Sequence, residues 1–477
     1  MNKIYSFTFC SLMLAILGCN KLVNVPGNAG AQLVTSQVFM DSADAVSGVV
    51  GLYGDASMTN RYIDRCTGLS SDELMATSGA GSVQLSNTNF YTEQPTAGSS
   101  TATGDASTLW APLYGSTGIF HANAALEAIK AAADSGLSMS LRNQLTGECK
   151  LVRAFQYFYL VNLFGPVPLV LSTDWRSTAL YGRAPVDSVY NQIERDLLDA
   201  QSKLVSTYPS AGHQRPNRYT ATALLARVYL YQKKWDLAKA MADTVINSGL
   251  YSLVSNLDNV FLDKSNEAIW QLGPNSTSVP LDAPGYSLFG AAAYSTYFGP
   301  SYWLSPSLVN AFELGDKRLA HWTTIDTIFS FGSGGNQYLP MYYKTKNYST
   351  IIRTGAEDLM VVRLAEIYLI RAEALAQQGD LAGSMADVNV IRARAGLGAI
   401  TAVDLSDALG KILHERQVEL FCEWGHRWLD LKRMDSVDAV MTRVKPQYWP
   451  ADGHTALYPI PYPELVSNQY LTQNLGY

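Results

Sequence analysis

Apolar residues recur at helical spacing over much of this chain. In residues 147–170 the clearest apolar stripe is formed by Leu151, Phe155, Phe158 and Tyr159. Positions four, seven and eight after the first lie on one face of a helix. Gly165 and Pro166 follow, and we expect the helix to end there because proline cannot continue the hydrogen-bond ladder. Another helix is predicted near residues 110–133.

Two later segments resemble each other. Residues 236–243 read DLAKAMAD and residues 380–387 read DLAGSMAD, and each follows a stretch rich in Ala, Leu and Tyr. A helix, a short turn and a second helix with small residues at packing positions is typical of tetratricopeptide (TPR) hairpins. The copies begin 144 residues apart, so they do not belong to an uninterrupted array. Weaker units are predicted around 110–165 and 185–230.

The segment between the two copies, residues 272–350, has little helical period. It is rich in aromatic residues, including Tyr286, Phe289, Tyr294, Tyr297, Phe298, Tyr302, Trp303, Tyr338, Tyr342 and Tyr343. Residues 78–108 are rich in Gly, Ser, Thr and Asn and predict a long surface loop. Loops on a rigid frame often carry recognition. We therefore predict a mainly α fold, a TPR-like helical-repeat scaffold with a long irregular, aromatic-rich ligand-binding insertion.

Composition narrows the function. The chain has 477 residues, a net charge of −6 and only 16% charged residues, against roughly 25% in an average soluble protein. No strongly basic stripe exists to neutralise phosphates, which argues against a nucleic-acid partner. A weakly charged sequence with 28 Tyr suits neutral polar ligands. At this length the chain makes about three domain equivalents, or one large fold with insertions.

The first residues read MNKIYSFTFCSLMLAILGC. A lysine, an apolar stretch over 4–17 and a small residue before Cys19 follow the order of an export signal. The ending resembles the bacterial lipobox, in which the cysteine becomes the lipidated first residue of the mature protein; the alternative is an ordinary cleaved signal with Cys19 incidental. No later segment offers about 18 uninterrupted apolar residues. We expect a chain anchored by lipid at Cys19 rather than one that spans the membrane.

The remaining cysteines are Cys66, Cys149 and Cys422. They form no CxxC pair and have no spacing typical of a zinc site, so no metal is predicted. One disulfide with one leftover thiol is an open alternative. Three small buried hydrophobic residues is the favoured interpretation, because two of the three lie in helix-like runs.

Catalytic patterns are absent from the sequence. There is no GxSxG, no GxxxxGK[ST] and no HExxH, and no cofactor is predicted. In residues 414–427, Glu415, Glu419 and Glu423 recur every four residues and would share one helix face. Arg416 and Arg427 in the same segment are expected to neutralise these glutamates, and apolar residues lie around them in the sequence. We interpret this cluster as ion pairs that hold a helix in the core, and predict no catalytic residue.

Several segments, in order, carry a family resemblance. They are GECKLVRAFQYFYLVNLFGPVPLV at 147–170, the helical hairpins at 218–253 and 361–397, ILHERQVELFCEWGHRWLDLKR at 412–433 and YPIPYPELVSNQYLTQNLGY at 458–477. Together they resemble the SusD/RagB family of outer-membrane lipoproteins of Bacteroidetes, nearly from end to end. The resemblance implies a signal peptide at 1–18, an N-terminal helical domain at 19–232 and a C-terminal domain at 262–477. The last would include the insertion at 272–350 and TPR-like helices at 360–433.

The resemblance also implies a function and partners. Such proteins are surface-exposed, capture a ligand, most often a glycan, and deliver it to a SusC-like TonB-dependent transporter. The TPR helices would face the transporter, and the irregular region would hold the ligand. Ligand identity does not carry over, because the family diverges in that region.

Candidate binding residues follow from the chemistry of sugars. Pyranose rings present apolar C–H faces that exposed aromatic rings contact at low entropic cost, while nearby amides satisfy the hydroxyls. The candidates in the insertion are Tyr286, Tyr297, Tyr302 and Trp303, and those in the N-terminal loop are Asn87, Asn89 and Tyr91. Aromatic residues on helical stripes, Trp110 and Tyr114 among them, are assigned to packing.

Three alternatives stay open. The same fold would capture peptides, as in the RagB branch, if charged residues lined the insertion. A lipoprotein glycan hydrolase would use the 414–427 cluster. A purely architectural surface protein would bind no ligand saturably.

Overall fold

The computed structural model describes residues 39–76, 82–100, 103–115, 118–132, 136–273, 302–328, 335–340 and 358–477. The predicted lipid anchor Cys19 and the candidate residues Tyr286 and Tyr297 lie outside these ranges.

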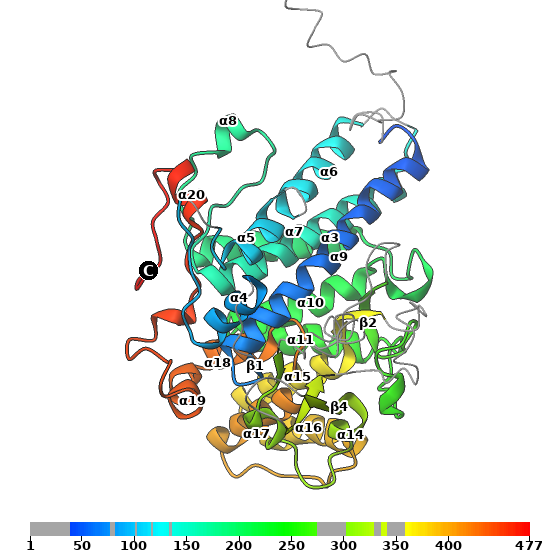
Figure 1. Cartoon of the computed structure of the whole chain (residues 1–477). Helices are drawn as coiled ribbons and strands as arrows, with labels where there is room; N and C mark the ends of the chain where they lie inside the picture. Colours follow the sequence, from blue (N-terminus) through cyan, green and yellow to red (C-terminus); the bar gives the residue numbers. More distant parts are fainter. Residues whose placement is uncertain are drawn as a thin grey trace, which may run out of the picture.

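Helices form most of the described structure (Figure 1). The long ones are α3 (Ser42–Ser70), α6 (Ile119–Ala131), α7 (Met139–Phe164), α9 (Val186–Lys203), α10 (Arg218–Tyr231), α11 (Trp235–Ile246), α15 (Leu364–Gln377), α16 (Leu381–Ala395) and α17 (Leu405–Glu419). From α6 onward each packs against the next along this series. The predicted mainly α, TPR-like scaffold is confirmed.

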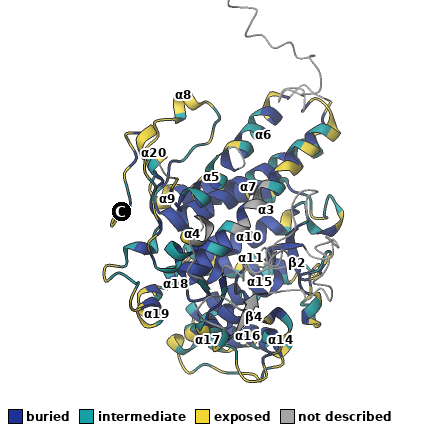
Figure 2. Ribbon diagram, in the orientation of Figure 1, coloured by how far each residue is buried: buried dark blue, intermediate teal, exposed yellow. Residues whose placement is uncertain are grey.

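Shorter helices lie around this series. They are α4 (Ser82–Tyr91), α5 (Ser107–Tyr114), α8 (Trp175–Thr178), α13 (Pro306–Val309), α14 (Lys317–Trp322), α18 (His426–Arg433), α19 (Val437–Val444) and α20 (Tyr462–Ser467). Figure 2 shows the long helices largely buried at the centre of the molecule and α8 and α20 largely exposed at its edge.

Local sequence explains where the central helices begin and end. The α10 helix starts with a capping box, in which Asn217 accepts a hydrogen bond from the Thr220 backbone N–H at 3.0 Å and the Thr220 side chain accepts one from the Asn217 backbone. At its start, α16 has Asp380 as N-cap, and it ends at Gly396 in the left-handed conformation, φ 85°. The α7 helix ends at Phe164, immediately before Gly165 at φ 74°, as the glycine–proline pair predicts.

The two hairpins that contain the DLA copies lie side by side although they are far apart in the sequence. The hairpin α10–α11 holds the first copy and the hairpin α15–α16 the second, and α11 packs directly on α15. Polar contacts join the first copy to α15: the Gln378 side chain donates to Asp236 at 2.7 Å, and Arg371 pairs with Asp243 at 2.9 Å. The intervening residues therefore leave the stack after α11 and rejoin it at α15.

The strands pair in three antiparallel, two-stranded ladders. They join β1 (Leu74–Ala76) to β3 (Tyr302–Leu304), β2 (Ala268–Leu272) to β6 (Leu359–Arg363), and β4 (Thr323–Ile328) to β5 (Gly335–Pro340). The β2–β6 pair closes the base of the insertion, since it aligns Leu272 with Leu359. Of the predicted irregular segment 272–350, the described residues thus form short strands and the short helices α13 and α14.

Two local predictions were wrong. The predicted loop at 78–108 contains the ten-residue helix α4, because Phe90 and Asn87 are buried where α4 packs on α3 and β1; tertiary packing here overrides weak helix propensity. The single helix predicted near 110–133 is two helices, α5 and α6. Gly118 precedes α6 in a non-helical conformation, and only glycine fits there because a Cβ would meet the Leu113 carbonyl oxygen at 2.1 Å.

Two further expectations concern the cysteines and the membrane. Cys66, Cys149 and Cys422 are free and buried, which confirms the prediction of small buried residues rather than a disulfide. Within the described ranges, no helix is both long and apolar enough to cross a bilayer.

Candidate ligand-binding surface

A pair of short strands brings the two groups of predicted binding residues into one region. Strand β3 comes from the insertion and pairs with β1, which directly precedes the N-terminal candidates on α4. The pairing continues beyond the strands, because the Ser305 backbone N–H donates to the Glu73 carbonyl at 2.7 Å and the Ser307 hydroxyl donates to the Asp72 carboxylate at 3.1 Å. The insertion is therefore tied to the N-terminal half where both contribute candidates.

Strand alternation decides which aromatic side chain of β3 faces outward. Tyr302 and Leu304 are only 4% and 2% exposed, whereas Trp303 between them is half-buried. Successive side chains of a strand point to opposite faces, so Trp303 lies on the face away from the core. Its cross-strand partner is Met75. Of the two described candidates in the insertion, Trp303 is placed to present a ring, and the buried Tyr302 supports the strand from the core side.

The three N-terminal candidates have different surroundings on α4. Asn89 donates a hydrogen bond from its side-chain amide to Asp105 at 2.9 Å. Asn87 is fully buried, and neither polar atom of its side chain has a hydrogen-bond partner. Contrary to expectation, Asn87 offers no exposed amide, and the Asn89 amide is used to hold the following loop.

Tyr91 packs against the C-terminal part of the chain. Its ring meets that of Tyr448 edge to face, with centroids 5.7 Å apart, and the Lys445 ammonium lies 4.7 Å from the ring centroid. Lys445 is itself buried and donates to Glu93 at 2.8 Å. The half-buried ring of Tyr91 thus has cation–π and aromatic partners within the protein.

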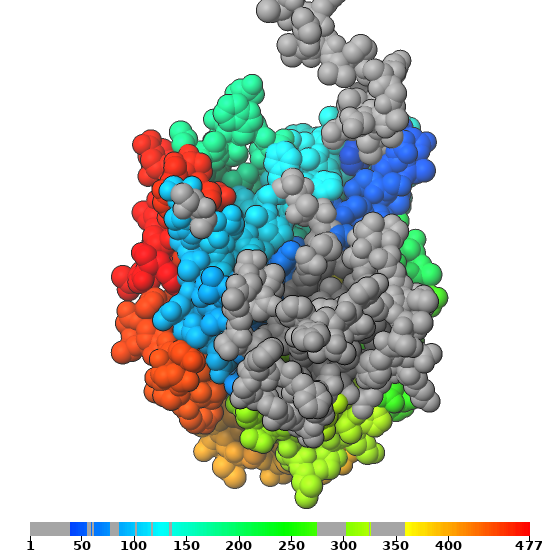
Figure 3. All heavy atoms as spheres, in the orientation of Figure 1, coloured from blue at the N-terminus to red at the C-terminus, as the bar shows by residue number. Residues whose placement is uncertain are grey.

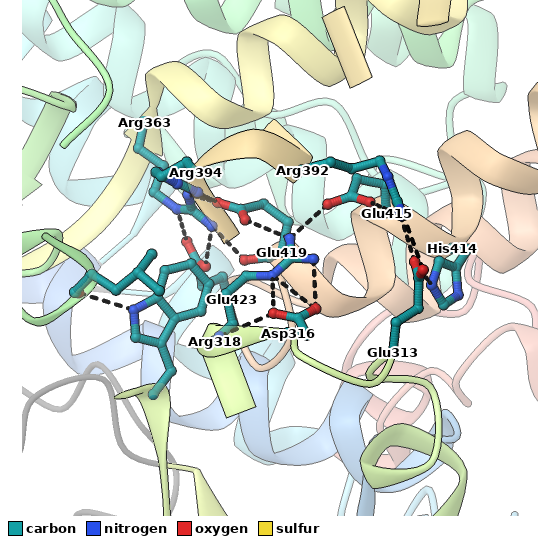
Figure 4. A network of polar contacts seen from close by, with 12 residues as sticks. Glu313, Asp316, Arg318, Arg363, Arg392, Arg394, His414, Glu415, Glu419 and Glu423 are labelled. Atoms are coloured by element: carbon teal, nitrogen blue, oxygen red, sulfur yellow. Dashed lines mark hydrogen bonds and ion pairs between the residues drawn. The ribbon is translucent and has the colours of Figure 1, made fainter. Parts of the chain in front are cut away.

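The glutamate cluster of 414–427 lies in a buried ion network (Figure 4). Arg318 pairs with Glu415 at 2.7 Å and with Glu419 at 2.8 Å, and Arg363 holds Glu423 through two nitrogens at 2.8 and 2.9 Å. Other members, whose side chains are all buried except that of Glu313, are Glu267, Glu313, Asp316, Arg392 and Arg394. Each of the three predicted glutamates therefore meets at least one guanidinium group.

The partners of these glutamates differ from the expected ones. Arg416 pairs with Asp430 at 2.6 Å, and Arg427 pairs with Asp72 at 2.7 Å. The arginines that neutralise the cluster come instead from α14, β6 and α16. A signal for three of them was present in the sequence, because Arg363, Arg392 and Arg394 belong to the 361–397 segment that carries the family resemblance.

The charge of Glu419, which three arginines share, is fixed, whereas burial raises the pKa of Glu423 to about 7 although Arg363 opposes it. Burial alone would raise the pKa of Glu419, but the surrounding guanidinium groups of Arg394, Arg363 and Arg318 outweigh it and lower the pKa to about 2. A general acid needs a pKa near the working pH, and Glu419 does not have one. The arrangement supports the interpretation that these ion pairs hold helices together.

Metal ligands are not clustered in the part of the chain that the structure describes. There, no group of three or more His, Cys, Asp or Glu side chains has an arrangement that could hold a metal ion. The imidazole of His426 is buried. Its burial, and to a smaller extent the positive charges of Arg227 and Arg416, lower its pKa well below the usual value.

The fold and this surface define a class: a helical-repeat protein that carries a candidate binding surface on an insertion between two adjacent hairpins. Comparison with known proteins gives the family. Residues 38–230 match the SusD-like model described as starch-binding and associating with the outer membrane, and residues 330–477 match the SusD/RagB model described as the SusD family. The chain belongs to the SusD/RagB family.

Curated relatives cover most of the chain at low identity. SusD-like protein P2 of Formosa agariphila is 26% identical over an alignment of 519 positions that covers 99% of each chain. The starch-binding protein SusD of Bacteroides thetaiotaomicron is 24% identical over 422 residues, 69% of this chain and 72% of that protein.

Solved structures share the fold. A SusD superfamily protein from Bacteroides vulgatus superposes with a TM-score of 0.75 at 19% identity and covers 92% of this chain and 100% of its own. A laminarin-binding SusD-like protein superposes with a TM-score of 0.70 at 25% identity, over 91% and 99% of the two chains.

Proposed function

We propose that this protein is a surface-exposed, lipid-anchored outer-membrane lipoprotein that binds an oligosaccharide or polysaccharide and delivers it to a SusC-like TonB-dependent transporter. It acts by binding alone, without catalysis. The observation that carries the proposal is the placement of Trp303 on the outer face of β3, beside the N-terminal half, in a chain of the SusD/RagB family.

The chemistry of this position suits a sugar. A half-buried indole is held rigid by its strand yet keeps part of one face available, and aromatic side chains contribute large contact area at low entropic cost. Tyr286 and Tyr297 remain proposed partners of Trp303 from the same insertion. The laminarin-binding neighbour and the starch-binding relative support a glycan as ligand class.

The buried ion network supports a role without catalysis. Its carboxylates are neutralised by arginines, so the one cluster that suggested hydrolysis has a structural explanation. Lipidation of Cys19 would hold the protein at the membrane, since acyl chains contribute about 0.8 kcal/mol per buried CH₂.

A binding screen tests the proposal. Residues 20–477, which include every residue that the structure describes, would be run through gels containing neutral polysaccharides, acidic polysaccharides or a peptide mixture. We expect retardation by one glycan class, and loss of it in Trp303→Ala with the melting temperature unchanged. Leu314→Ala is the matched control, because Leu314 is fully exposed and its truncation should leave both properties intact.

Other outcomes separate the alternatives. Binding confined to peptides would favour the RagB-like function, and the absence of any saturable binding would favour an architectural role. Release of reducing ends from a bound glycan would contradict the non-catalytic part of the proposal.

A further inference from the structure

A second aromatic cleft lies away from Trp303, between α5, α6, the segment 168–181 and α20. Its volume is about 210 Å³. Five aromatic side chains line it: Trp110, Tyr114, Phe120, Trp175 and Tyr181. In Figure 1, α8 and α20 are at the upper left, whereas β1, the partner of β3, is at the lower centre. In Figure 3, the green segment that contains α8 and the red segment that contains α20 lie close together at the surface.

The rim of the cleft is exposed and aromatic. Trp175 is 66% exposed, Phe120 47% and Tyr181 42%. Core packing does not account for rings at this exposure, and a group of them around one cavity is typical of a binding surface. The inner wall differs, because Trp110 is buried and stacks on Tyr114 with ring centroids 5.2 Å apart and planes 7° apart.

The walls are held in place by hydrogen bonds from several elements. Glu127 on α6 accepts from the Ser172 hydroxyl and from the Thr173 backbone N–H, both at 2.9 Å. On the other side, the Asn468 amide donates to the Tyr181 carbonyl at 2.9 Å. A site built this way keeps its shape without a ligand, which lowers the entropic cost of binding.

A donor and an acceptor meet at the base of the cleft. The Trp110 indole N–H is buried and makes no hydrogen bond of standard geometry. Close to it lies the Glu464 carboxyl, whose pKa is raised by burial and lowered, to a smaller extent, by this indole. The indole and the carboxyl therefore form a buried donor–acceptor pair, and a hydroxyl of a ligand would accept from the indole and donate to the carboxylate.

The charge and size of the cleft restrict its ligand. None of its lining residues is Lys, Arg or His, and the Arg176 guanidinium beside the cleft lies over the Trp175 ring, 5.2 Å from its centroid, so the lining itself favours a neutral ligand. Its volume is below the roughly 300–1,000 Å³ of pockets that enclose drug-sized ligands. A neutral ring with apolar faces and hydroxyl edges satisfies both limits, as well as the donor–acceptor pair.

We propose that this cleft is a second carbohydrate subsite, which takes one or two neutral sugar units between the rings of Trp175 and Phe120 and anchors a hydroxyl on Trp110 and Glu464. The choice of sugar as ligand class rests in part on the proposed function. The position of the subsite does not rest on the proposed function, because the cleft and Trp303 lie on different helices and strands. A long glycan would then be held at two separated points.

Fluorine NMR of residues 20–477 labelled with 5-fluorotryptophan tests the two sites independently. The signals of Trp110, Trp175 and Trp303 are assigned from single Trp→Phe variants. Laminarin- and starch-derived oligosaccharides and their monosaccharides are then added at millimolar concentration. We expect the Trp110 and Trp175 signals to shift saturably with at least one of these sugars, and to do so also in Trp303→Ala.

Two variants connect the shifts to the cleft. Trp175→Ala should weaken the affinity reported by the Trp110 signal about tenfold, and Glu464→Gln should weaken it with little change of melting temperature. Leu314→Ala should leave the affinity unchanged.

The outcomes separate the two proposals. A Trp303 shift without any shift of Trp110 or Trp175 overturns the second subsite and leaves the proposed function intact. Shifts of Trp110 and Trp175 alone support the cleft and count against Trp303. If no signal responds, both fail, and an exposed aromatic cleft without sugar affinity would instead favour a protein partner.

Discussion

The ion network under the C-terminal helices and the aromatic surface at β3 present opposite kinds of chemistry. In the network, Glu415, Glu419 and Glu423 each meet an arginine within 3 Å and are buried. At β3, Trp303 has a strand to hold it and a face that the core does not use. A dense group of charges is therefore a poor guide to function when its members satisfy one another, and a ring that the core does not use is the better candidate to test.

Removing a charge from the network should produce the largest effect. Glu419→Gln deletes the negative charge that three arginines share, and it turns one acceptor oxygen into a donor that faces guanidinium groups. Breaking a buried ion pair costs about 3–5 kcal/mol. We expect the free energy of unfolding, measured by urea titration, to fall by about this amount.

Ligand binding by Glu419→Gln should persist at a temperature where the variant is still folded. A variant of unchanged stability that has lost glycan binding or turnover would contradict the structural role of this glutamate and favour a catalytic one.

Whereas Glu419→Gln should lower the free energy of unfolding, Glu73→Gln should raise it at neutral pH. Burial, with a contribution from the Asp72 carboxylate, raises the pKa of Glu73 from 4.5 to about 8. Between these values the unfolded chain has released the proton and the folded chain retains it. The contribution of Glu73 to stability therefore falls as the pH rises through this window, by up to about 1.4 kcal/mol per pH unit.

Glu73→Gln cannot ionise and should not lose stability in this way. Relative to the parent protein, it should gain about 3 kcal/mol between roughly pH 5 and pH 8, as measured by urea unfolding at both values. Equal pH profiles of the two proteins would show that Glu73 is ionised in the folded state.

A smaller effect is expected at Trp303, and on a different property. Trp303→Ala should lower glycan affinity by about 1–2 kcal/mol, roughly 5- to 30-fold. The free energy of unfolding should change by less than about 1 kcal/mol because the ring is half-buried. Trp303→Phe, which keeps an aromatic face, should retain part of the affinity in calorimetric titration. A large loss of stability without loss of affinity would show that Trp303 stabilises the fold and does not bind the glycan.

The smallest effect is expected at an exposed ion pair. Lys233 and Asp435 are 3.6 Å apart, with side chains 60% and 86% exposed. Asp435→Asn is the matched control for Glu419→Gln, since the chemical change is the same and only the burial differs. Exposed pairs contribute little, so we expect no resolvable shift of the urea midpoint.

Periodicity predicted the helices well, and contact partners poorly. The stripe ending at Gly165 and the two DLA copies identified α7 and both hairpins, because helical spacing and turn residues are local properties. Helix α4 was missed, since its formation depends on packing against α3 and β1. Glu419 pairs with Arg318, about 100 positions earlier in the chain. This contact depends on the tertiary structure and could not be predicted from residue spacing.

The candidate binding surface could be predicted in part for the same reason. Aromatic enrichment in the sequence pointed to the insertion. Deciding that the side chain of Trp303 faces outward and that of Tyr302 faces the core requires the β1–β3 pairing, which only the structure gives. The cleft beside α20 was not predicted. Trp110 and Tyr114 were assigned to packing, which the stacked pair confirms, but nothing local indicates that the segment 168–181 and the C-terminal helix enclose them.

The β2–β6 ladder gives the insertion a narrow neck, and this has an evolutionary consequence. Residues 273–358 leave and re-enter the helical stack through two adjacent strands, between hairpins that already pack on each other. Arg318 and strand β3 within this segment are tied to the ion network and to β1, so they are expected to stay constant. Because loop-closure entropy grows only with the logarithm of loop length, insertions or deletions between these fixed points cost the helical stack little. If the segment holds the ligand, as proposed, ligand preference can change there while the helices stay the same.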